Sequence, residues 1–105
     1  GSNGVGLKYH LKAINNYTRA NKLSSIEDLF SVPGGVIYDT INTNVFYAIG
    51  GLMASIIDKK LGYKGVIKFA NCHSDEECFN FFAKVCKLKD EEVDSFLFKE
   101  LKKYE

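Results

Sequence analysis

The chain has 105 residues, 46% of them hydrophobic, and a single proline, a composition that excludes a disordered or low-complexity protein. Fourteen Lys and Arg face thirteen Asp and Glu, so the net charge of +1 provides no strong field to recruit nucleic acid or anionic lipid. The longest nearly apolar run, residues 45–57, falls short of the roughly 20 residues that cross a bilayer. We therefore expect no nucleic-acid partner and no membrane span in this chain.

The length of the chain bears on its domain organisation. A protein of this size buries roughly two thirds of its unfolded surface, which supports one small core and leaves no room for a second. Residues 1–2, Gly-Ser, have the form of an expression scar. We expect residues 3–105 to form a single helical domain that belongs to a longer protein.

Two helices are predicted before residue 33. Apolar residues recur at helical spacing over about residues 7–21, which predicts an amphipathic helix. Ser24 and Glu27 have the spacing of a capping box, so a short second helix should follow. The side chains expected to point inward from it are Ile26, Leu29 and Phe30. Pro33-Gly34-Gly35 then interrupts the chain.

The longest predicted helix covers about residues 43–61, after a segment rich in capping residues. Its apolar residues occupy more than one face, so we expect it to be central and contacted on most sides. Gly50 and Gly51 lie in its middle, where each glycine costs roughly 1 kcal/mol relative to alanine. This cost indicates that another backbone approaches one of them closely. Gly62 is a suitable C-terminal stop.

Three further helices complete the prediction. Residues 63–71 include strand-forming side chains, but we favour a short helix because no second strand is available to pair with them. Its expected inward-facing side chains are Val66, Ile67 and Ala70. Ser74 and Glu77 form a capping box that begins a helix to about Lys87, and Asp90 caps the last helix. The side chains expected to face inward are Cys78, Phe79, Phe82, Val85 and Cys86 in the first of these helices, and Val93, Phe96, Leu97 and Leu101 in the last. The expected fold class is all-α, with five or six helices packed around the helix at about 43–61.

The cysteines and histidines are the candidate metal-binding and redox side chains. Cys72, His73 and Cys78 offer at most three donors, and adjacent Cys and His seldom bind one metal, so no zinc site is predicted. A Cys72–Cys78 disulfide is an alternative if the protein is exported. A catalytic Cys–His pair lacks an orienting third group. The interpretation we favour makes Cys78 and Cys86 small buried hydrophobic residues on a helix. We expect no metal or cofactor in this chain.

The segment from Tyr47 to Gly62, YAIGGLMASIIDKKLG, resembles a segment of the gluzincin zinc metallopeptidases, in their aminopeptidase branch and in the peptidase-MA-like group. In that family a tyrosine is followed three positions later by glycine, and an apolar helix then ends at a second glycine. Tyr47, Gly50 and Gly62 fall in this register. Residues 25–30, SIEDLF, resemble the helix that precedes the tyrosine segment, and the capped segments after Gly62 resemble the family's tail.

This resemblance implies a C-terminal helical subdomain that forms one wall of a peptide-binding cleft and is inactive in isolation. Gluzincins bind zinc with two histidines of an HExxH motif and a glutamate on a later helix, and this sequence contains neither feature. Zinc is therefore expected in the full-length parent, in a domain of the same polypeptide that precedes residue 1. The implied partners are that domain and a peptide or protein substrate. The family also implies a bacterial parent that is often exported.

The resemblance assigns one catalytic role within this chain, to Tyr47. In the aminopeptidase branch, the tyrosine at this register donates a hydrogen bond to the oxyanion that develops during peptide hydrolysis. A core aromatic whose hydroxyl reaches a carbonyl is the alternative role for Tyr47, since the residue lies in an apolar helix. For the protein as a whole, the alternative function is a non-catalytic helical protein-interaction module.

Overall fold

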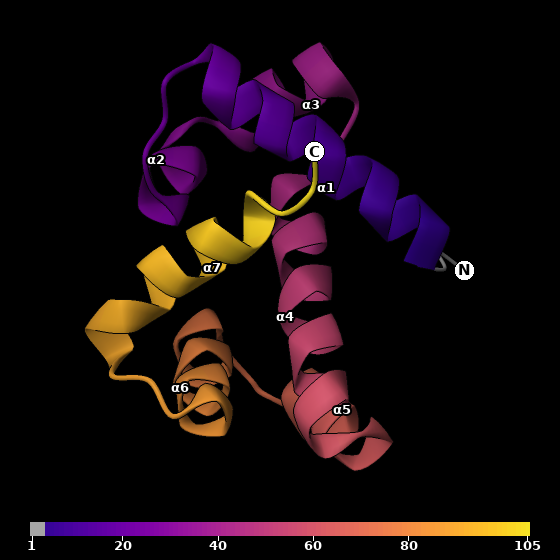
Figure 1. Ribbon diagram of the computed structural model, residues 1–105, viewed down its shortest axis with the longest axis vertical. Helices are drawn as coiled ribbons and strands as arrows, with labels where there is room; N and C mark the ends of the chain where they lie inside the picture. Colours follow the sequence, from indigo (N-terminus) through magenta and orange to yellow (C-terminus); the bar gives the residue numbers. More distant parts are fainter. Residues whose placement is uncertain (1–3) are drawn as a thin grey trace. The chain divides into compact units, whose positions relative to one another are not determined.

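A computed structural model describes residues 4–105, with side chains from Gly6 onward. Within these residues the chain forms seven α-helices and no strand, so the all-α class predicted from the sequence is confirmed (Figure 1). The expected expression scar at residues 1–2 lies outside the described residues. The helices are α1 Gly4–Ala20, α2 Ile26–Ser31, α3 Gly34–Ile41, α4 Val45–Leu61, α5 Tyr63–Ala70, α6 Asp75–Cys86 and α7 Val93–Leu101. A 3₁₀ turn, Asp90–Glu92, precedes α7.

The contacts between residues divide the chain into two compact units. The first unit contains the described residues up to Leu52 together with Asp94–Glu105, and the second contains Met53–Val93. α4 contributes residues to both units.

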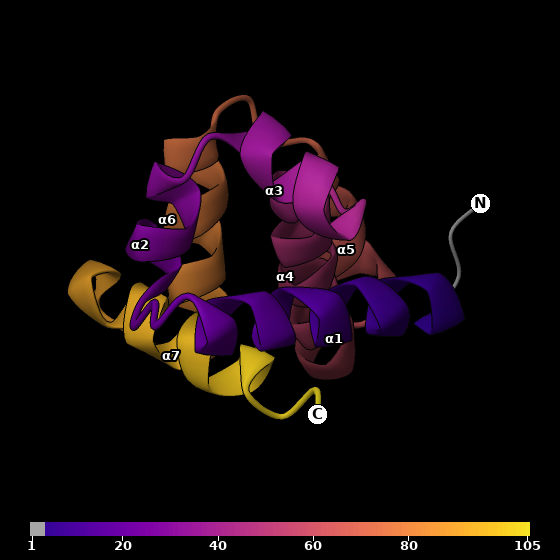
Figure 2. The ribbon, with the colours of Figure 1, turned by 90° about the horizontal axis from the view of Figure 1, so that it is seen from above.

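In the first unit, α1 packs against the C-terminal end of the chain. Its apolar face buries Leu11 and Ile14 completely, as the helical spacing predicts. The Asn15 side-chain amide donates a hydrogen bond of 2.7 Å to the carbonyl of Tyr104, and Lys102 Nζ donates one of 3.0 Å to Thr18 Oγ1. Two polar residues of α1 can therefore be buried because residues after α7 satisfy part of their hydrogen-bonding capacity. Figures 1 and 2 show α1 beside the end of α7.

The cap of α2 differs from the predicted one by one residue. Ser25, not Ser24, is the N-cap, and its hydroxyl accepts a hydrogen bond of 2.9 Å from the backbone N–H of Asp28. Ser24 instead donates its own N–H and hydroxyl to the Asp28 carboxylate. Ile26 and Leu29 are buried as expected, and Phe30 is half-buried. The two adjacent serines made both registers possible, and the burial of Ile26 and Leu29 is compatible with either.

α3 is the helix that the sequence prediction missed. The Pro33-Gly34-Gly35 segment was expected to interrupt the chain, but the helix begins directly after Pro33, which has a φ of −54°. A proline at this position starts a helix at little cost because it lacks only an N–H that would have no helical partner. Ile37 anchors α3 in the core, and Asn42 ends the helix in the left-handed conformation with a φ of 53°.

α4 begins at Val45, two residues later than predicted. Asn44 caps it, because its side-chain oxygen accepts a hydrogen bond of 3.0 Å from the backbone N–H of Tyr47. The buried side chains of α4 are Val45, Ala48, Ile49, Leu52, Met53, Ile56 and Ile57. Phe46, Tyr47 and Leu61 are exposed, so the expectation that α4 is covered on most sides is wrong at both ends of the helix.

The paired glycines of α4 have different surroundings. A Cβ built on Gly51 would stand 2.7 Å from Leu7 Cδ1 of α1, whereas a Cβ on Gly50 would meet nothing within 4 Å. The expected close approach is therefore present at Gly51. The neighbour is a leucine side chain, and not the helix backbone that was expected.

The second unit is built from the end of α4 with α5 and α6. The preference for a helix over residues 63–71 is confirmed, but its inward face was misassigned. Gly65 is buried against Ile57 and Leu61, whereas Ile67 and Ala70 are exposed. The sequence pattern missed this face because its innermost residue is a glycine, which carries no hydrophobic side chain to mark it.

The helix over residues 75–86 begins as predicted. Ser74 is the N-cap, and its hydroxyl accepts a hydrogen bond of 3.1 Å from the backbone N–H of Glu77. Phe82 and Ala83 are its fully buried residues. The predicted inward-facing residues Cys78, Phe79, Val85 and Cys86 are only half-buried.

The start of the last helix also differs from the prediction. The N-cap is Lys89, whose backbone N–H donates a hydrogen bond of 2.8 Å to Glu92 Oε1, and Asp90 is the first residue of the 3₁₀ turn. The structure therefore moves the predicted cap by one residue. Val93, Leu97 and Leu101 are buried as expected, and Phe96 is half-buried.

Candidate functional site

Tyr47, the one residue with a predicted catalytic role, lies in the first turn of α4. Its side chain is 62% exposed, so the alternative role of a core aromatic with an internal partner is wrong. Its backbone N–H is fixed by the Asn44 cap, which sets the direction of the first turn of α4. A tyrosine held in this way presents its phenol outward from an ordered backbone.

The position of Tyr47 along α4 is defined by its neighbours at i−4 and i+4. Residues four apart lie on the same face of a helix, so Tyr47 and Gly51 share one face of α4, whereas Thr43 precedes the helix. Thr43 Oγ1 lies 2.8 Å from His10 Nδ1, and Gly51 is covered by Leu7. Both of these partners belong to the first half of α1, so the residues four before and four after Tyr47 contact that part of α1.

Two further exposed aromatic residues lie near the start of α4. Phe46 and Tyr38 are each 52% exposed, and they line a hollow of about 260 Å³ together with Gly34, Gly35, Asn44 and Val45. The Phe46 ring packs on Phe30, with 4.7 Å between the ring centroids. We call Tyr38, Phe46 and Tyr47 the aromatic surface. Only Tyr47 among them was singled out from the sequence, because Tyr38 lies in the helix that was missed.

A larger hollow, of about 610 Å³, lies between α1 and α3 in the first unit. Two tyrosines of α1, Tyr9 and Tyr17, line it with the side chains of Asn16, Asn21 and Asn42. Aromatic rings provide contact area and amides provide hydrogen bonds in both directions, a combination suited to binding polypeptide. The sequence analysis did not predict this hollow, since one of its walls is α3.

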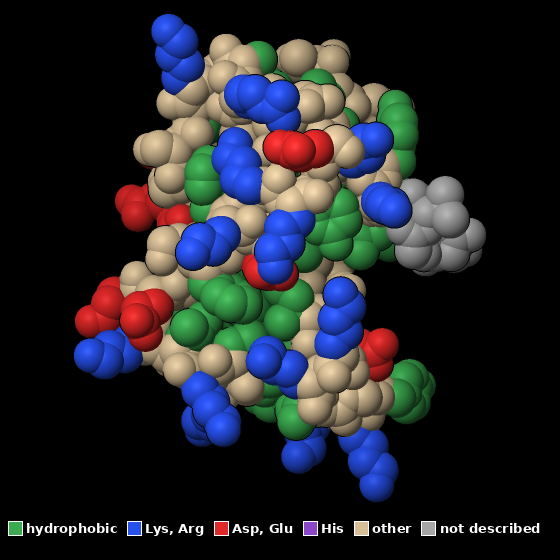
Figure 3. All heavy atoms as spheres, in the orientation of Figure 1, with side chains coloured by type: hydrophobic (Ala, Val, Ile, Leu, Met, Phe, Trp, Pro, Cys, Tyr) green, Lys and Arg blue, Asp and Glu red, His purple; other side chains and the backbone are tan. Residues whose placement is uncertain are grey.

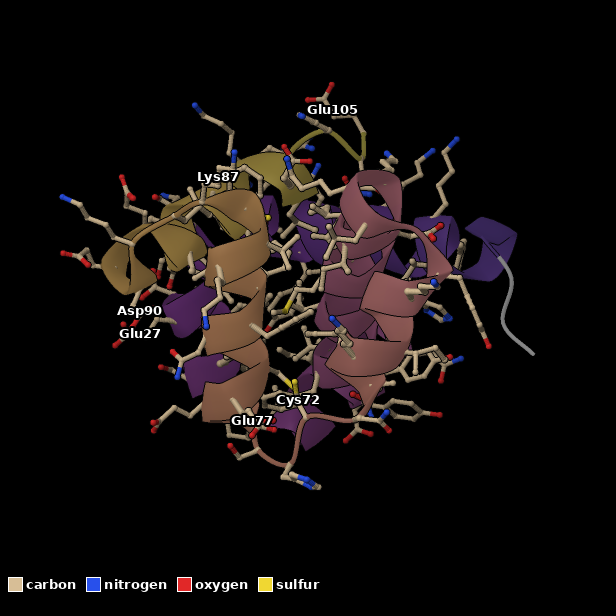
Figure 4. All side chains as sticks on the ribbon, turned by 90° about the horizontal axis from the view of Figure 1, so that it is seen from below. Glu27, Cys72, Glu77, Lys87, Asp90 and Glu105 are labelled. Atoms are coloured by element: carbon tan, nitrogen blue, oxygen red, sulfur yellow. The ribbon has the colours of Figure 1, made fainter. Side chains whose placement is uncertain are left out.

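The cysteines of the second unit are free thiols, so the structure lacks the Cys72–Cys78 disulfide considered from the sequence. Burial is the main cause that raises the pKa of the Cys78 thiol, and the neighbouring Cys72 thiol adds to it. Cys72 lines a hollow of about 400 Å³ together with Glu77, Lys68 and Lys84, and Figure 4 shows Cys72 and Glu77 at the same end of α6. A raised pKa lowers the fraction of reactive thiolate, so Cys78 should be a weaker nucleophile than an ordinary cysteine.

Metal-ligating side chains do not gather in the part of the chain that the structure describes. No group of three His, Cys, Asp or Glu side chains there could hold one metal ion. The residues present therefore do not fit a zinc site, which needs at least three protein ligands.

The described helices were also compared with the requirements of a membrane span. None of them is by itself long and apolar enough to cross a bilayer. α3 and α4 taken together reach the length and composition, but their axes bend by 87° at the break between them.

No protein-family model matches this chain, nor does any curated protein or any solved structure. The structure therefore defines the fold class of this protein, which is all-α, and the comparisons add no family to it. The relationship to gluzincin metallopeptidases remains a hypothesis based on the residues that carry the resemblance.

Proposed function

We propose that this chain is the C-terminal helical subdomain of a gluzincin-type zinc metallopeptidase, in which it forms one wall of the peptide-binding cleft. The observation that carries the proposal is the place of Tyr47. Its side chain is exposed at the start of α4, and the residues four before and four after it contact the N-terminal half of α1. A preceding domain would join the chain at this end of α1, so Tyr47 would face the domain interface.

The chemistry of a phenol suits the role assigned to Tyr47. A tyrosine hydroxyl is a neutral hydrogen-bond donor at pH 7, because its ordinary pKa is about 10. It can donate to an oxygen that gains negative charge during hydrolysis without first losing a proton of its own. One such donor is typically worth roughly 10²–10³ in turnover.

In this proposal the zinc ion belongs to the preceding domain of the same polypeptide. The described residues of this chain supply no set of ligands for it. The proposed contribution of the chain is limited to a hydrogen-bond donor and an aromatic wall. The chain alone is expected to hydrolyse no peptide.

The first test reads the coding sequence upstream of residue 1. The proposal requires an HExxH motif there, followed by a glutamate a few tens of residues later. A different upstream domain, or a start codon at this point, would refute it.

The second test measures peptidase activity of the full-length protein with Tyr47→Phe. We expect turnover to fall by roughly 10²–10³ while zinc content and the circular dichroism spectrum stay unchanged. Tyr63→Phe is the matched control, since Tyr63 is another exposed tyrosine but lies in the second unit. Equal activity of the Tyr47→Phe variant and the wild type would exclude the catalytic role.

A second function, a non-catalytic protein-interaction module, is favoured by the hollow between α1 and α3. Its tyrosines and asparagine amides could bind an extended peptide segment without any catalytic group. Peptides selected from a displayed library against the chain would test this function. Binding that is lost in Tyr17→Ala and kept in Tyr63→Ala supports the module, and selection of no peptide argues against it.

A further inference from the structure

The segment that joins α4 to α5 has a charge that the net charge of the whole chain conceals. Residues 58–68, which we call the α4–α5 corner, contain four lysines and one aspartate, a local charge of +3 in a chain of net +1. The lysines are Lys59, Lys60, Lys64 and Lys68, and all four side chains are exposed. In Figure 3, Lys and Arg side chains are spread over the whole face, and several of them lie over α5 and the end of α4.

The same corner exposes three large apolar side chains. Tyr63, the first residue of α5, is 74% exposed, the highest value among the exposed large hydrophobic residues of the described chain. Leu61 is 52% exposed and Ile67 is 41% exposed. Isolated apolar side chains are common on protein surfaces, but Tyr63 and Ile67 lie one turn apart on the same face of α5 and form an exposed apolar pair. Leu61 instead packs against Gly65 on the inner side of α5.

The geometry of α5 arranges these side chains into two strips. With 100° between successive residues, Tyr63, Ile67 and Ala70 fall within one narrow arc, and Lys64 and Lys68 fall on the arc beside it. Gly65 lies on the opposite side and is buried against α4. The outer surface of α5 is therefore amphipathic, although its inner surface is already occupied.

The positive charge of the corner is only partly neutralised by neighbouring groups. Within the described residues, no carboxylate forms an ion pair with any of the four lysines. No side chain caps the N-terminus of α5, so the positive end of the helix dipole adds to their charge. Three acids of the second unit, residues 75–77, are in the first turn of α6 instead. Glu77 shares a hollow with Lys68, which limits the positive surface on that side.

We propose that the α4–α5 corner binds the surface of a membrane that contains anionic phospholipids. Tyr63 and Ile67 enter the interfacial region, and the lysines contact the lipid phosphates. Tyrosine is favoured at this depth because its ring is apolar and its hydroxyl remains hydrated. This surface binding is independent of the peptidase proposal, since the corner and Tyr47 belong to different units.

The composition of the corner favours a lipid surface over other anionic partners. Single-stranded nucleic acid binds to basic surfaces that carry several aromatic platforms, and the exposed apolar side chains here include a single aromatic ring. An acidic polypeptide would use the lysines but would leave the protruding Tyr63 and Ile67 in water. A bilayer interface uses both the charges and the apolar side chains.

The first experiment uses a fluorescent reporter, because the chain contains no tryptophan. Tyr63→Trp is mixed with vesicles of phosphatidylcholine and phosphatidylserine, and separately with vesicles of phosphatidylcholine alone. We expect the emission to shift to shorter wavelength with the anionic vesicles only. Tyr9→Trp is the matched control at an exposed tyrosine of the first unit, and its emission should not shift.

The second experiment measures cosedimentation of the full chain with the anionic vesicles. Each lysine near such a surface contributes about fivefold to binding, so Lys60→Gln with Lys64→Gln should weaken it about 25-fold. Tyr63→Ser with Ile67→Ser should weaken binding by about tenfold or more, because the apolar contact is lost. Lys8→Gln with Lys12→Gln removes two exposed lysines of α1 and should leave binding unchanged. Circular dichroism checks that each variant is folded.

Several results would overturn the proposal. The first is no cosedimentation with anionic vesicles, and the second is equal cosedimentation with neutral ones. The third is unchanged binding of the Tyr63→Ser, Ile67→Ser variant together with equally tight binding of soluble polyglutamate, which would identify an acidic polypeptide as the partner. An equal loss of binding in the α1 lysine control would show that the attraction is not located at the corner.

Discussion

The carboxylate of Asp94, near the start of α7, accepts hydrogen bonds from the backbone N–H groups of Ile26 and Glu27, at 2.7 Å and 2.9 Å. These are the first two N–H groups of α2, and helix-terminal N–H groups have no partner within their own helix. The Ser25 hydroxyl accepts from the third one, that of Asp28. The first three N–H groups of this six-residue helix are thus all paired, and two of them donate to a residue 68 and 67 positions further along the chain.

We expect Asp94→Ala to destabilise the protein by about 1–2 kcal/mol, because two N–H groups of α2 lose their acceptor. Asp94→Asn should lower the free energy of unfolding by less, since the side-chain oxygen of asparagine can still accept a hydrogen bond from one of these N–H groups. The measurement is urea unfolding followed by circular dichroism. Asp39→Ala, which removes an exposed aspartate of α3, is the control. If Asp94→Ala lost no more unfolding free energy than Asp39→Ala, the hydrogen bonds of Asp94 would contribute nothing to stability.

The glycines of the helices should respond to alanine in opposite directions. Gly65→Ala should cost about 1–3 kcal/mol, because the new Cβ would stand 2.6 Å from Leu61 Cβ, an atom fixed to the backbone of α4. Gly50→Ala should stabilise by about 0.5–1 kcal/mol, because its site is open and alanine favours the helix.

Gly51 should fall between these two. Alanine there meets the flexible end of Leu7, which can rotate away, so the change in stability should be small. Gly51→Leu should cost about 1–3 kcal/mol, because a larger side chain overpacks the contact with α1. Unfolding free energies of the four variants provide the comparison. The same sign for Gly65→Ala and Gly50→Ala would contradict this account of the packing.

The sequence predicted the helices whose signals are local. Ser74 and the acids that follow it mark the start of α6, and Val93, Leu97 and Leu101 mark the buried face of α7. α3 was missed because Pro33-Gly34-Gly35 was interpreted only as a break, although proline also suits the position just before a helix. The contacts of Asp94 with α2 could not be predicted, since they depend on tertiary structure.

The candidate site was predictable only in part. The resemblance to a family singled out Tyr47, but no local pattern shows which side of α4 remains in water. The hollow between α1 and α3 and the aromatic surface both require α3, so a missed helix removed both from the prediction. The α4–α5 corner is visible in the sequence as DKKLGYKGVIK, but exposure of Tyr63 follows only once Gly65 is known to face α4.

The stability of the protein should depend on the ionisation of Asp28. Hydrogen bonds from the backbone and then the side chain of Ser24 hold the pKa of Asp28 below its ordinary value of 3.8. These bonds are absent in the unfolded chain, where the pKa returns to the ordinary value. The ionised carboxylate therefore stabilises the folded state above about pH 4, and this contribution is lost as the pH falls through the lower pKa of the folded state.

We expect the difference in unfolding free energy between the wild type and Asp28→Asn to be constant near neutral pH and to shrink below about pH 4. Ser24→Ala removes the hydroxyl donor but keeps the backbone donor, so its wild-type difference should shrink in the same range and by a smaller amount. Urea unfolding at a series of pH values measures both. If the difference in unfolding free energy between the wild type and Asp28→Asn grew as the pH fell, folding would raise the pKa of Asp28 and not lower it.

Cys78 should react with iodoacetamide more slowly in the folded protein than in the unfolded chain. Burial raises the pKa of this thiol, and the Cys72 thiol and the carboxylates of Asp75 and Glu77 raise it further, so less thiolate is present at pH 8. Peptide mapping by mass spectrometry after timed alkylation, with and without urea, measures the rate at Cys78 alone. In Cys72→Ser the folded-state rate should rise, because one cause of the higher pKa is removed, but it should stay below the unfolded rate because burial is the largest cause. Equal folded and unfolded rates at Cys78 would mean that its thiol is neither buried nor influenced by its neighbours.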